Sequence, residues 1–163
     1  MNVNAFKSSF QDFLRLNRFE VQINRMNGQK MKFHVKSAGL PGSTIASIPV
    51  PYMGRQIKIP GDRTYEDWNV SVMLDNTAQL RDDLYNWHET INATIANVGP
   101  SAVNSVKSDG LITTFKTDGS PGIKYKVIGI FPTNVGVVEY SKDSNDTIAE
   151  CQVTFAIDWF EKA

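Results

Sequence analysis

The spacing of hydrophobic residues along the chain predicts a protein built mainly of β-strands. Apolar side chains occupy alternate positions in residues 19–24, 31–36 and 68–74, which is the period of a strand with one buried face. Asn27-Gly28 stands between the first two segments and favours the positive φ angles of a type I′ turn. We therefore expect residues 19–36 to form a β-hairpin.

The second half of the chain shows the same alternation. Strands are predicted at residues 111–116 and 123–131, with a further short strand at 135–140. Residues 149–159 alternate without interruption, and their apolar side chains share one face. The opposite face carries Glu150, Gln152, Thr154 and Asp158. This pattern predicts one long final strand.

One segment has helical spacing instead. Its apolar residues are separated by three or four positions: Leu80, Leu84, Trp87, Ile91 and Ile95. Charged residues lie between them, so residues 77–97 are predicted to form an amphipathic helix of about five turns. Asn76 or Thr77 can cap its start, and Gly99-Pro100 marks its end.

The first residues of the chain carry apolar side chains at spacings of three and four, at Val3, Phe6 and Phe10. This spacing predicts a short amphipathic helix or a docking arm. We take residues 1–17 as an N-terminal arm.

Residues 39–63 have a different character, since they hold four prolines and four glycines around two β-like stretches, 44–50 and 55–59. Proline has no backbone N–H to donate to a strand ladder, so these stretches belong at a sheet edge or on an extended arm. A segment of this kind within a domain is usually functional. We expect it to contact a partner.

Composition places the chain among ordinary globular proteins. Its 163 residues suit a single domain, here taken as residues 1–163. Lys plus Arg number 17, as do Asp plus Glu, so no net field gathers nucleic acid or anionic lipid. No apolar run approaches the ~18 residues of a membrane span, so membrane insertion is not expected. The predicted fold class is mainly β, an antiparallel β-sandwich or open barrel with one flanking α-helix.

The residues that could carry chemistry are few. His34 and His88 lie far apart in the sequence, and each is interpreted as a surface or packing residue. Cys151 falls on the apolar face of the final strand, which favours a buried, unreactive thiol. Residues 143–146 are acidic but lack the spacing and closing Glu of an EF-hand, so they are interpreted as a turn. No catalytic residue, metal site or cofactor is predicted, and the chain is not expected to be an enzyme.

Two long blocks of the sequence carry a family resemblance. The first runs through Gly39-Leu40-Pro41-Gly42, residues 48–55 and residues 61–68. The second comprises residues 129–134, Asp143-Ser144, residues 153–156 and Asp158-Trp159. Together with residues 17–21, they make the chain resemble the tail tube proteins of T-even-like contractile-tailed bacteriophages.

The resemblance implies a structural virion protein. Its subunits would join into hexameric rings whose sheets close into one ring-shaped β-barrel, and the rings would stack into a tube. The tube would lie within a contractile sheath, surround a tape measure protein, meet baseplate and tail terminator proteins, and conduct DNA without binding it specifically. Assembly would take place in the host cytoplasm. The alternatives are a tube subunit of a related contractile injection or secretion system, and a non-viral β-sandwich binding module.

Two sets of residues are predicted to serve assembly. The inter-subunit contact set comes from residues 39–63: Leu40, Pro41, Pro49, Tyr52, Gly54, Arg55, Gly61 and Arg63. The channel-lining set comes from polar strand positions: Gln22, Asn24, Gln152 and Thr154.

Lysines on the same polar positions complicate the channel. The polar face of the predicted hairpin carries three positive residues, Lys30, Lys32 and Lys36, and one negative residue, Glu20. A basic channel lining would bind DNA through counterion release. We therefore expect most of these lysines to be paired with carboxylates of a neighbouring subunit, and others to point outward past the channel rim. Glu150 and Asp158 are the candidate partners.

Overall fold

The molecule consists of two β-layers, and one long strand, β7 (Pro121–Val135), runs from the first layer into the second. The computed structural model describes residues 3–9, 13–26 and 28–163. Its elements are α1 (Val3–Ser9), β1 (Phe19–Ile23), α2 (Gly28–His34), β2 (Val35–Ala38), β3 (Ser43–Tyr52), β4 (Arg55–Tyr65), β5 (Trp68–Met73), α3 (Gln79–Ile91), the 3₁₀ turn η1 (Val103–Ser105), β6 (Ser108–Phe115), β7 (Pro121–Val135), β8 (Glu150–Ala156) and β9 (Trp159–Lys162).

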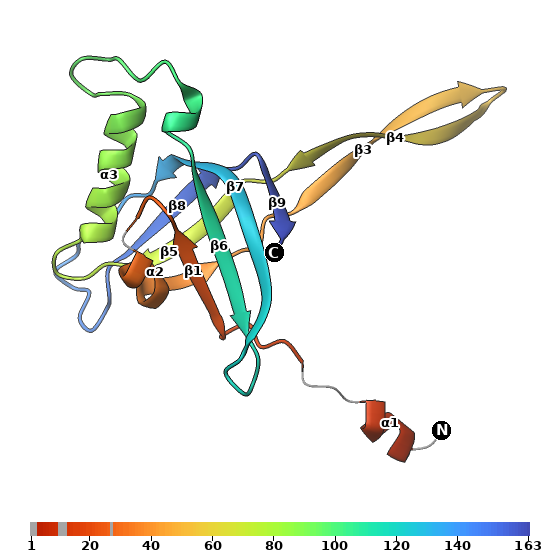
Figure 1. The fold of residues 1–163 in the computed structure, drawn as a ribbon, viewed down its shortest axis with the longest axis horizontal. Helices are drawn as coiled ribbons and strands as arrows, with labels where there is room; N and C mark the ends of the chain where they lie inside the picture. Colours follow the sequence, from red (N-terminus) through yellow and green to blue (C-terminus); the bar gives the residue numbers. More distant parts are fainter. Residues whose placement is uncertain (1–2, 10–12, 27) are drawn as a thin grey trace.

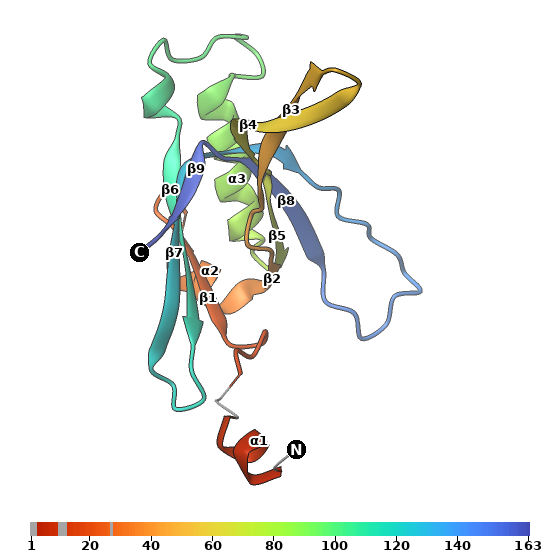
Figure 2. The same cartoon turned by 90° about the vertical axis from the view of Figure 1, so that its right-hand side faces the viewer.

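In the described part of the chain, seven strands form one antiparallel sheet in the order β1-β6-β7-β8-β5-β2, with β9 on β7. The first part of β7 pairs with β6 and β9, and its last residues, from Phe131 onward, pair with β8. Gly129 lies between these parts with φ +69°, where a side chain would collide with Asp158. The sheet therefore folds over, and Figure 2 shows β1, β6 and β7 on one side and β2, β5 and β8 on the other.

The core lies between the layers. Trp68 on β5 and Phe155 on β8 are opposite each other in register, and their rings are 5.7 Å apart. Gly110 on β6 makes room for the Trp68 ring, because a Cβ at Gly110 would come within 2.8 Å of it. Val21, Val127 and other apolar residues complete this fully buried cluster.

Helix α3 completes the core. Leu80, Leu84 and Trp87 are buried, as their spacing predicts. The Trp87 ring lies 6.0 Å from that of Phe155, and its Nε1 donates a hydrogen bond to the Val106 carbonyl at 2.7 Å. The predicted class, mainly β and antiparallel with a flanking helix, is confirmed.

The predicted hairpin at residues 19–36 is wrong. Residues 28–34 form helix α2, and β1 and β2 pair with different partners in different layers, β6 and β5. Met31 is buried and Phe33 is exposed, so the alternation of residues 31–36 does not mark one buried strand face. Residues 28–34 connect a strand of one layer to a strand of the other. This tertiary context overrides the alternating pattern of apolar residues. The proposed turn at Asn27 lies outside the described residues.

Helix α3 is shorter than predicted. It begins at Gln79, after Ala78 at φ +47°, and no side chain caps it; the Thr77 hydroxyl donates to Asp75 instead. It ends at Ile91, and Ile95 is fully exposed. The Glu89 carboxylate accepts hydrogen bonds from the backbone N–H and hydroxyl of Thr94, which holds the following residues in a turn.

The end of the chain also differs from the prediction. The final strand is broken into β8 and β9, because the Asp158 N–H bonds to the Ile128 carbonyl and turns the chain onto β7. Trp159 is consequently half exposed. Residues 136–140 do not form the predicted short strand, since β7 ends at Val135.

Candidate assembly surfaces

The β3–β4 hairpin projects from the two layers as an extended arm (Figure 1). Its strands of ten and eleven residues are joined by Met53-Gly54, with φ angles of +42° and +79°. Positive φ at both turn residues is the type I′ geometry, which matches strand twist. Every residue of β3 is exposed. The β-like stretches predicted within residues 39–63 are thus the two strands of one hairpin.

One face of this hairpin is apolar. Ile48 lies opposite Ile59, and Val50 lies opposite Ile57. These four side chains are between 42% and 59% exposed. Projecting aliphatic side chains gathered on one face mark a surface that another molecule covers.

The predicted contact residues are divided between the hairpin and its base. Pro49, Tyr52, Gly54, Arg55 and Arg63 lie exposed on the hairpin. Gly61 is half-buried, and a side chain there would press on Ala46 of the facing strand. Leu40 is exposed before the hairpin, whereas Pro41 is buried by its own chain and offers no surface.

The outer face of the β2–β5–β8 layer is polar and mostly uncharged. Asn69 is opposite Thr154 and Ser71 is opposite Gln152 across β5 and β8. The Thr154 hydroxyl donates to Asn69 Oδ1 at 2.8 Å. Short hydroxyl and amide side chains give a surface that holds water without offering fixed charge.

The structure does not bring the four predicted channel residues together. Gln152 and Thr154 lie on this face, whereas Gln22 lies on the outer face of β1 in the other layer, opposite Leu111. Gln22 donates to Glu20 at 2.8 Å, and Asn24 is exposed just beyond the end of β1. The two outer faces point away from each other (Figure 2).

The lysines of concern are paired within the subunit. Five ion pairs join described residues: Lys30–Asp75 (2.5 Å), Lys32–Glu20 (3.0 Å), Lys36–Glu150 (2.5 Å), Lys107–Asp158 (2.7 Å) and Lys126–Asp109 (3.3 Å). Glu150 is thus a partner as predicted, though within one chain, and Asp158 is taken by Lys107. Partly exposed pairs contribute little to stability, so their main effect is to cancel charge.

Asp75 has the most perturbed carboxyl group. Hydrogen bonds from Lys30 and Thr77 hold the pKa of Asp75 far below its usual range. This pair fixes α2 to the loop that precedes α3. Local sequence pattern could not predict this pair, because the two residues are 45 positions apart.

The described residues offer little for catalysis. No group of three or more His, Cys, Asp and Glu residues among them could hold a metal ion. Cys151 is buried, and burial raises the pKa of its thiol. His88 Nε2 lies 3.1 Å from the Pro132 carbonyl, a packing contact. None of the described helices has the length and apolar character required to span a membrane.

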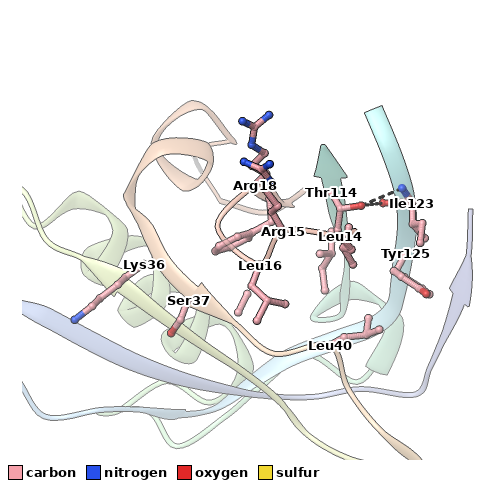
Figure 3. A pocket seen from close by; sticks show the side chains of 13 residues that line it. Leu14, Arg15, Leu16, Arg18, Lys36, Ser37, Leu40, Thr114, Ile123 and Tyr125 are labelled. Atoms are coloured by element: carbon pink, nitrogen blue, oxygen red, sulfur yellow. Dashed lines mark hydrogen bonds between the residues drawn. The ribbon is translucent and has the colours of Figure 1, made fainter. Parts of the chain in front are cut away.

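An apolar hollow of about 420 Å³ lies between β1 and β2, the two end strands of the sheet (Figure 3). Leu14, Leu16 and Leu40 contribute to its wall. Arg15 and Arg18 stand beside it, and Arg18 donates to the carbonyls of Lys116 and Thr117 at 3.0 and 2.7 Å.

A projecting hairpin with an uncovered apolar face, beside surfaces with cancelled charge, suits a self-assembling protein. Residues 3–161 match the sequence model of the phage tail tube protein family. The chain belongs to this family. It is 33% identical over 158 residues to tail tube protein gp19 of Enterobacteria phage T4, covering 96% of this chain and 95% of the T4 protein. The gp19 of phage T6 matches to the same extent.

Chains of two solved assemblies share the fold of this chain. A chain of the PVC sheath-tube complex, an extracellular contractile injection system, superposes with a TM-score of 0.69 at 18% identity, over 100% of this chain and 98% of that one. A chain of the PVC sheath/tube terminator gives 0.74 at 18% identity, over 95% and 99%. These likenesses show a shared fold.

Family membership confirms the resemblance found in the sequence. The chain is a structural tail tube protein, a component of the virion tail, and not an enzyme. Sequence reasoning located the hairpin but missed its apolar face. The signal was present, because Ile48, Val50, Ile57 and Ile59 alternate on either side of a turn at Met53-Gly54.

Proposed function

We propose that this chain forms hexameric rings that stack into the hollow inner tube of a phage tail. The tube lies within a contractile sheath and conducts DNA during ejection. Residues 1–163 act as one tail tube domain, with residues 1–17 as an arm and residues 39–63 as the inter-subunit element. Membership of the phage tail tube family supports the tube itself.

The observation that carries the proposal is the uncovered apolar face of the β3–β4 hairpin. An isolated two-stranded hairpin is marginally stable in water, and here every residue of β3 is exposed within the subunit. Contact with another subunit would bury Ile48, Val50, Ile57 and Ile59 together. Tyr52, Arg55 and Arg63 would then provide polar contacts around them, since arginine can bind a carboxylate through two parallel hydrogen bonds.

The end strands of the sheet support ring formation. β1 and β2 stand at the two ends of the strand order, and each pairs with one neighbouring strand. Exposed strand edges invite pairing with another chain, and closure into a barrel removes them. A ring in which each subunit's sheet continues into the next satisfies these edges.

The outer face of the β2–β5–β8 layer is the better candidate for the channel lining. A conduit that holds no DNA needs few free cations, because each neutralised phosphate adds affinity. Asn69, Ser71, Gln152 and Thr154 are uncharged, and Lys36 on this side is paired with Glu150. This proposal keeps Gln152 and Thr154 in the lining and places Gln22 and Asn24 on the opposite side of the subunit.

The partners follow from the tube. They are other copies of the chain, a tail sheath protein, a tape measure protein, and baseplate and tail terminator proteins, with assembly in the host cytoplasm. Fold similarity to chains of a sheath-tube complex and a sheath/tube terminator supports the sheath and terminator. The alternative, a contractile injection system, is supported by fold similarity at 18% identity to a chain of the PVC sheath-tube complex. The 33% identity to gp19 of phage T4 favours a phage tail.

Shortening the hairpin tests the proposal. Thr44 and Thr64 are opposite each other in register, so residues 45–63 can be replaced by an Asn-Gly turn while Tyr65 keeps its contact with Phe160. The shortened subunit should have the same free energy of unfolding as the full chain. It should form no tubes that negative-stain microscopy can detect. Tubes of normal stability from the shortened chain would overturn the proposal.

A further inference from the structure

The loop between β7 and β8, residues 136–149, has the properties of a surface that receives the hairpin. We call it the acidic loop. It carries Glu139, Asp143 and Asp146 against one cation, Lys142, a net charge of −2. Val137, Tyr140 and Ile148 are large apolar residues exposed on it. The loop borders a hollow of about 560 Å³ that also reaches Gln152.

The hairpin is complementary to this loop in charge and in polarity. Residues 43–65 carry Arg55, Lys58 and Arg63 against Asp62, a net charge of +2. Among the described residues, none of the ion pairs includes these hairpin cations or the three carboxylates of the acidic loop. Both surfaces therefore combine uncovered apolar side chains with unneutralised charge of opposite sign.

The two surfaces lie at opposite ends of the subunit. In Figure 1 the hairpin extends to the upper right, and the acidic loop, coloured blue between β7 and β8, lies at the lower left. A contact between two different patches of the same chain is heterologous, and it generates an extendable assembly where the copies stack. The placement suits contact between successive rings.

The apolar hollow between β1 and β2 is the competing acceptor. Its lining includes Arg15 and Arg18 and no carboxylate, and the charge of Lys36, which also lines it, is cancelled by Glu150 outside the hollow. A hairpin with a net charge of +2 would meet like charge there, which disfavours the encounter. Charge thus selects the acidic loop over this hollow.

We propose that the hairpin of one subunit docks on the acidic loop of a second copy in the adjacent ring. The inference rests on the proposed tube, and it names the receiving surface. The apolar face of the hairpin covers Val137, Tyr140 and Ile148, and the positive charge of Arg55, Lys58 and Arg63 is attracted to Glu139, Asp143 and Asp146.

Charge exchange tests the contact. The hairpin reversal, Arg55→Glu with Lys58→Glu, and the loop reversal, Asp143→Lys with Asp146→Lys, should each raise the concentration needed for tube assembly by about tenfold or more, since like charges then oppose each other. The four substitutions together should restore assembly. The control, Asp82→Lys with Glu161→Lys, changes charge as the loop reversal does and should assemble normally. Failure of the fourfold variant to regain assembly would overturn the inference.

Cross-linking gives a second reading that does not depend on charge. Met53→Cys with Val137→Cys places thiols at the hairpin turn and on the acidic loop, and Cys151 is buried. Oxidised tubes should yield a ladder of covalent multimers. The matched pair, Met53→Cys with Leu16→Cys at the competing hollow, should not. A ladder from the Leu16 pair alone would overturn the inference and leave the tube intact, whereas absence of tubes from the unaltered chain would overturn the proposed function itself.

Discussion

Lys36 on β2 reaches past β5 to Glu150 on β8, and its Nζ lies 2.5 Å from Oε1. The pair cancels the charge of a lysine on the layer whose outer face we assign to the channel. Asn69, Gln152 and Thr154, which lie on the same face of β5 and β8, are uncharged. DNA that passes along this face would therefore not meet an unpaired Lys36.

Removal of the carboxylate should create a DNA-binding site. In Glu150→Gln tubes, Lys36 is left without its partner in every subunit, and repetition around each ring multiplies the charge. We expect binding of short duplex DNA that weakens steeply with salt, measured at ~0.05 to 0.2 M, and little binding by unaltered tubes. Glu161→Gln makes the same charge change on β9 and should bind no more than the unaltered protein. Equal binding by the two variants would remove the β2–β5–β8 face from the channel.

The apolar face of the hairpin should matter for assembly and not for folding. Ile48→Asn with Ile57→Asn alters side chains that are about half exposed, so the free energy of unfolding should change by less than ~0.5 kcal/mol for each. Tube formation should be lost. Tyr85→Asn on the exposed side of α3 is the control and should assemble. Normal tubes from the hairpin variant would show that this face is not an interface.

Trp87 should be a major contributor to subunit stability. The side chain is buried against Phe155, so Trp87→Ala should lower the free energy of unfolding by about 3–5 kcal/mol, measured by urea denaturation. Ile95 lies beyond the end of α3 and is fully exposed, so Ile95→Ala should have little effect. Similar losses from both variants would contradict the position of the helix end.

The Lys30–Asp75 pair should make stability depend on acid pH. The pKa of Asp75 is lowered in the folded state, so its contribution is present above the ordinary aspartate value of about 4 and is lost as the pH falls below it. Asp75→Asn should be less stable than the unaltered protein at pH ~6, and the difference should shrink toward pH ~3. Since Asp75 is partly exposed, the effect should also diminish with salt. A constant difference across this range would assign the loss to packing.

The alternation of apolar and polar residues was sufficient to predict strands that bury one face in the core. Alternation located β1, β5 and β8 because Val21, Val70 and Val153 all point into the same core. It failed at α2, where the seven-residue helix is set by the crossing between layers and not by its own sequence period. The break between β8 and β9 likewise depends on the Ile128 carbonyl, which is distant in sequence.

The candidate surfaces were foreseeable in part. Proline and glycine marked the hairpin region, because these residues exclude it from the interior of a sheet. Glu150 was a candidate partner for the lysines, but its pairing with Lys36 within one chain depends on the strand order β2-β5-β8, because the two residues are 114 positions apart. The division of Gln22 and Gln152 between two outer faces also required the fold of the sheet at Gly129.

Electron cryo-microscopy of the concentrated, unaltered protein can show whether the chain forms a tube and which face lines it. We expect hollow tubes of stacked rings with six subunits each, in which Gln152 and Thr154 face the channel and the hairpin covers a neighbouring subunit. Particles that remain monomeric at high concentration would contradict it. So would tubes in which the hairpin stays exposed to solvent.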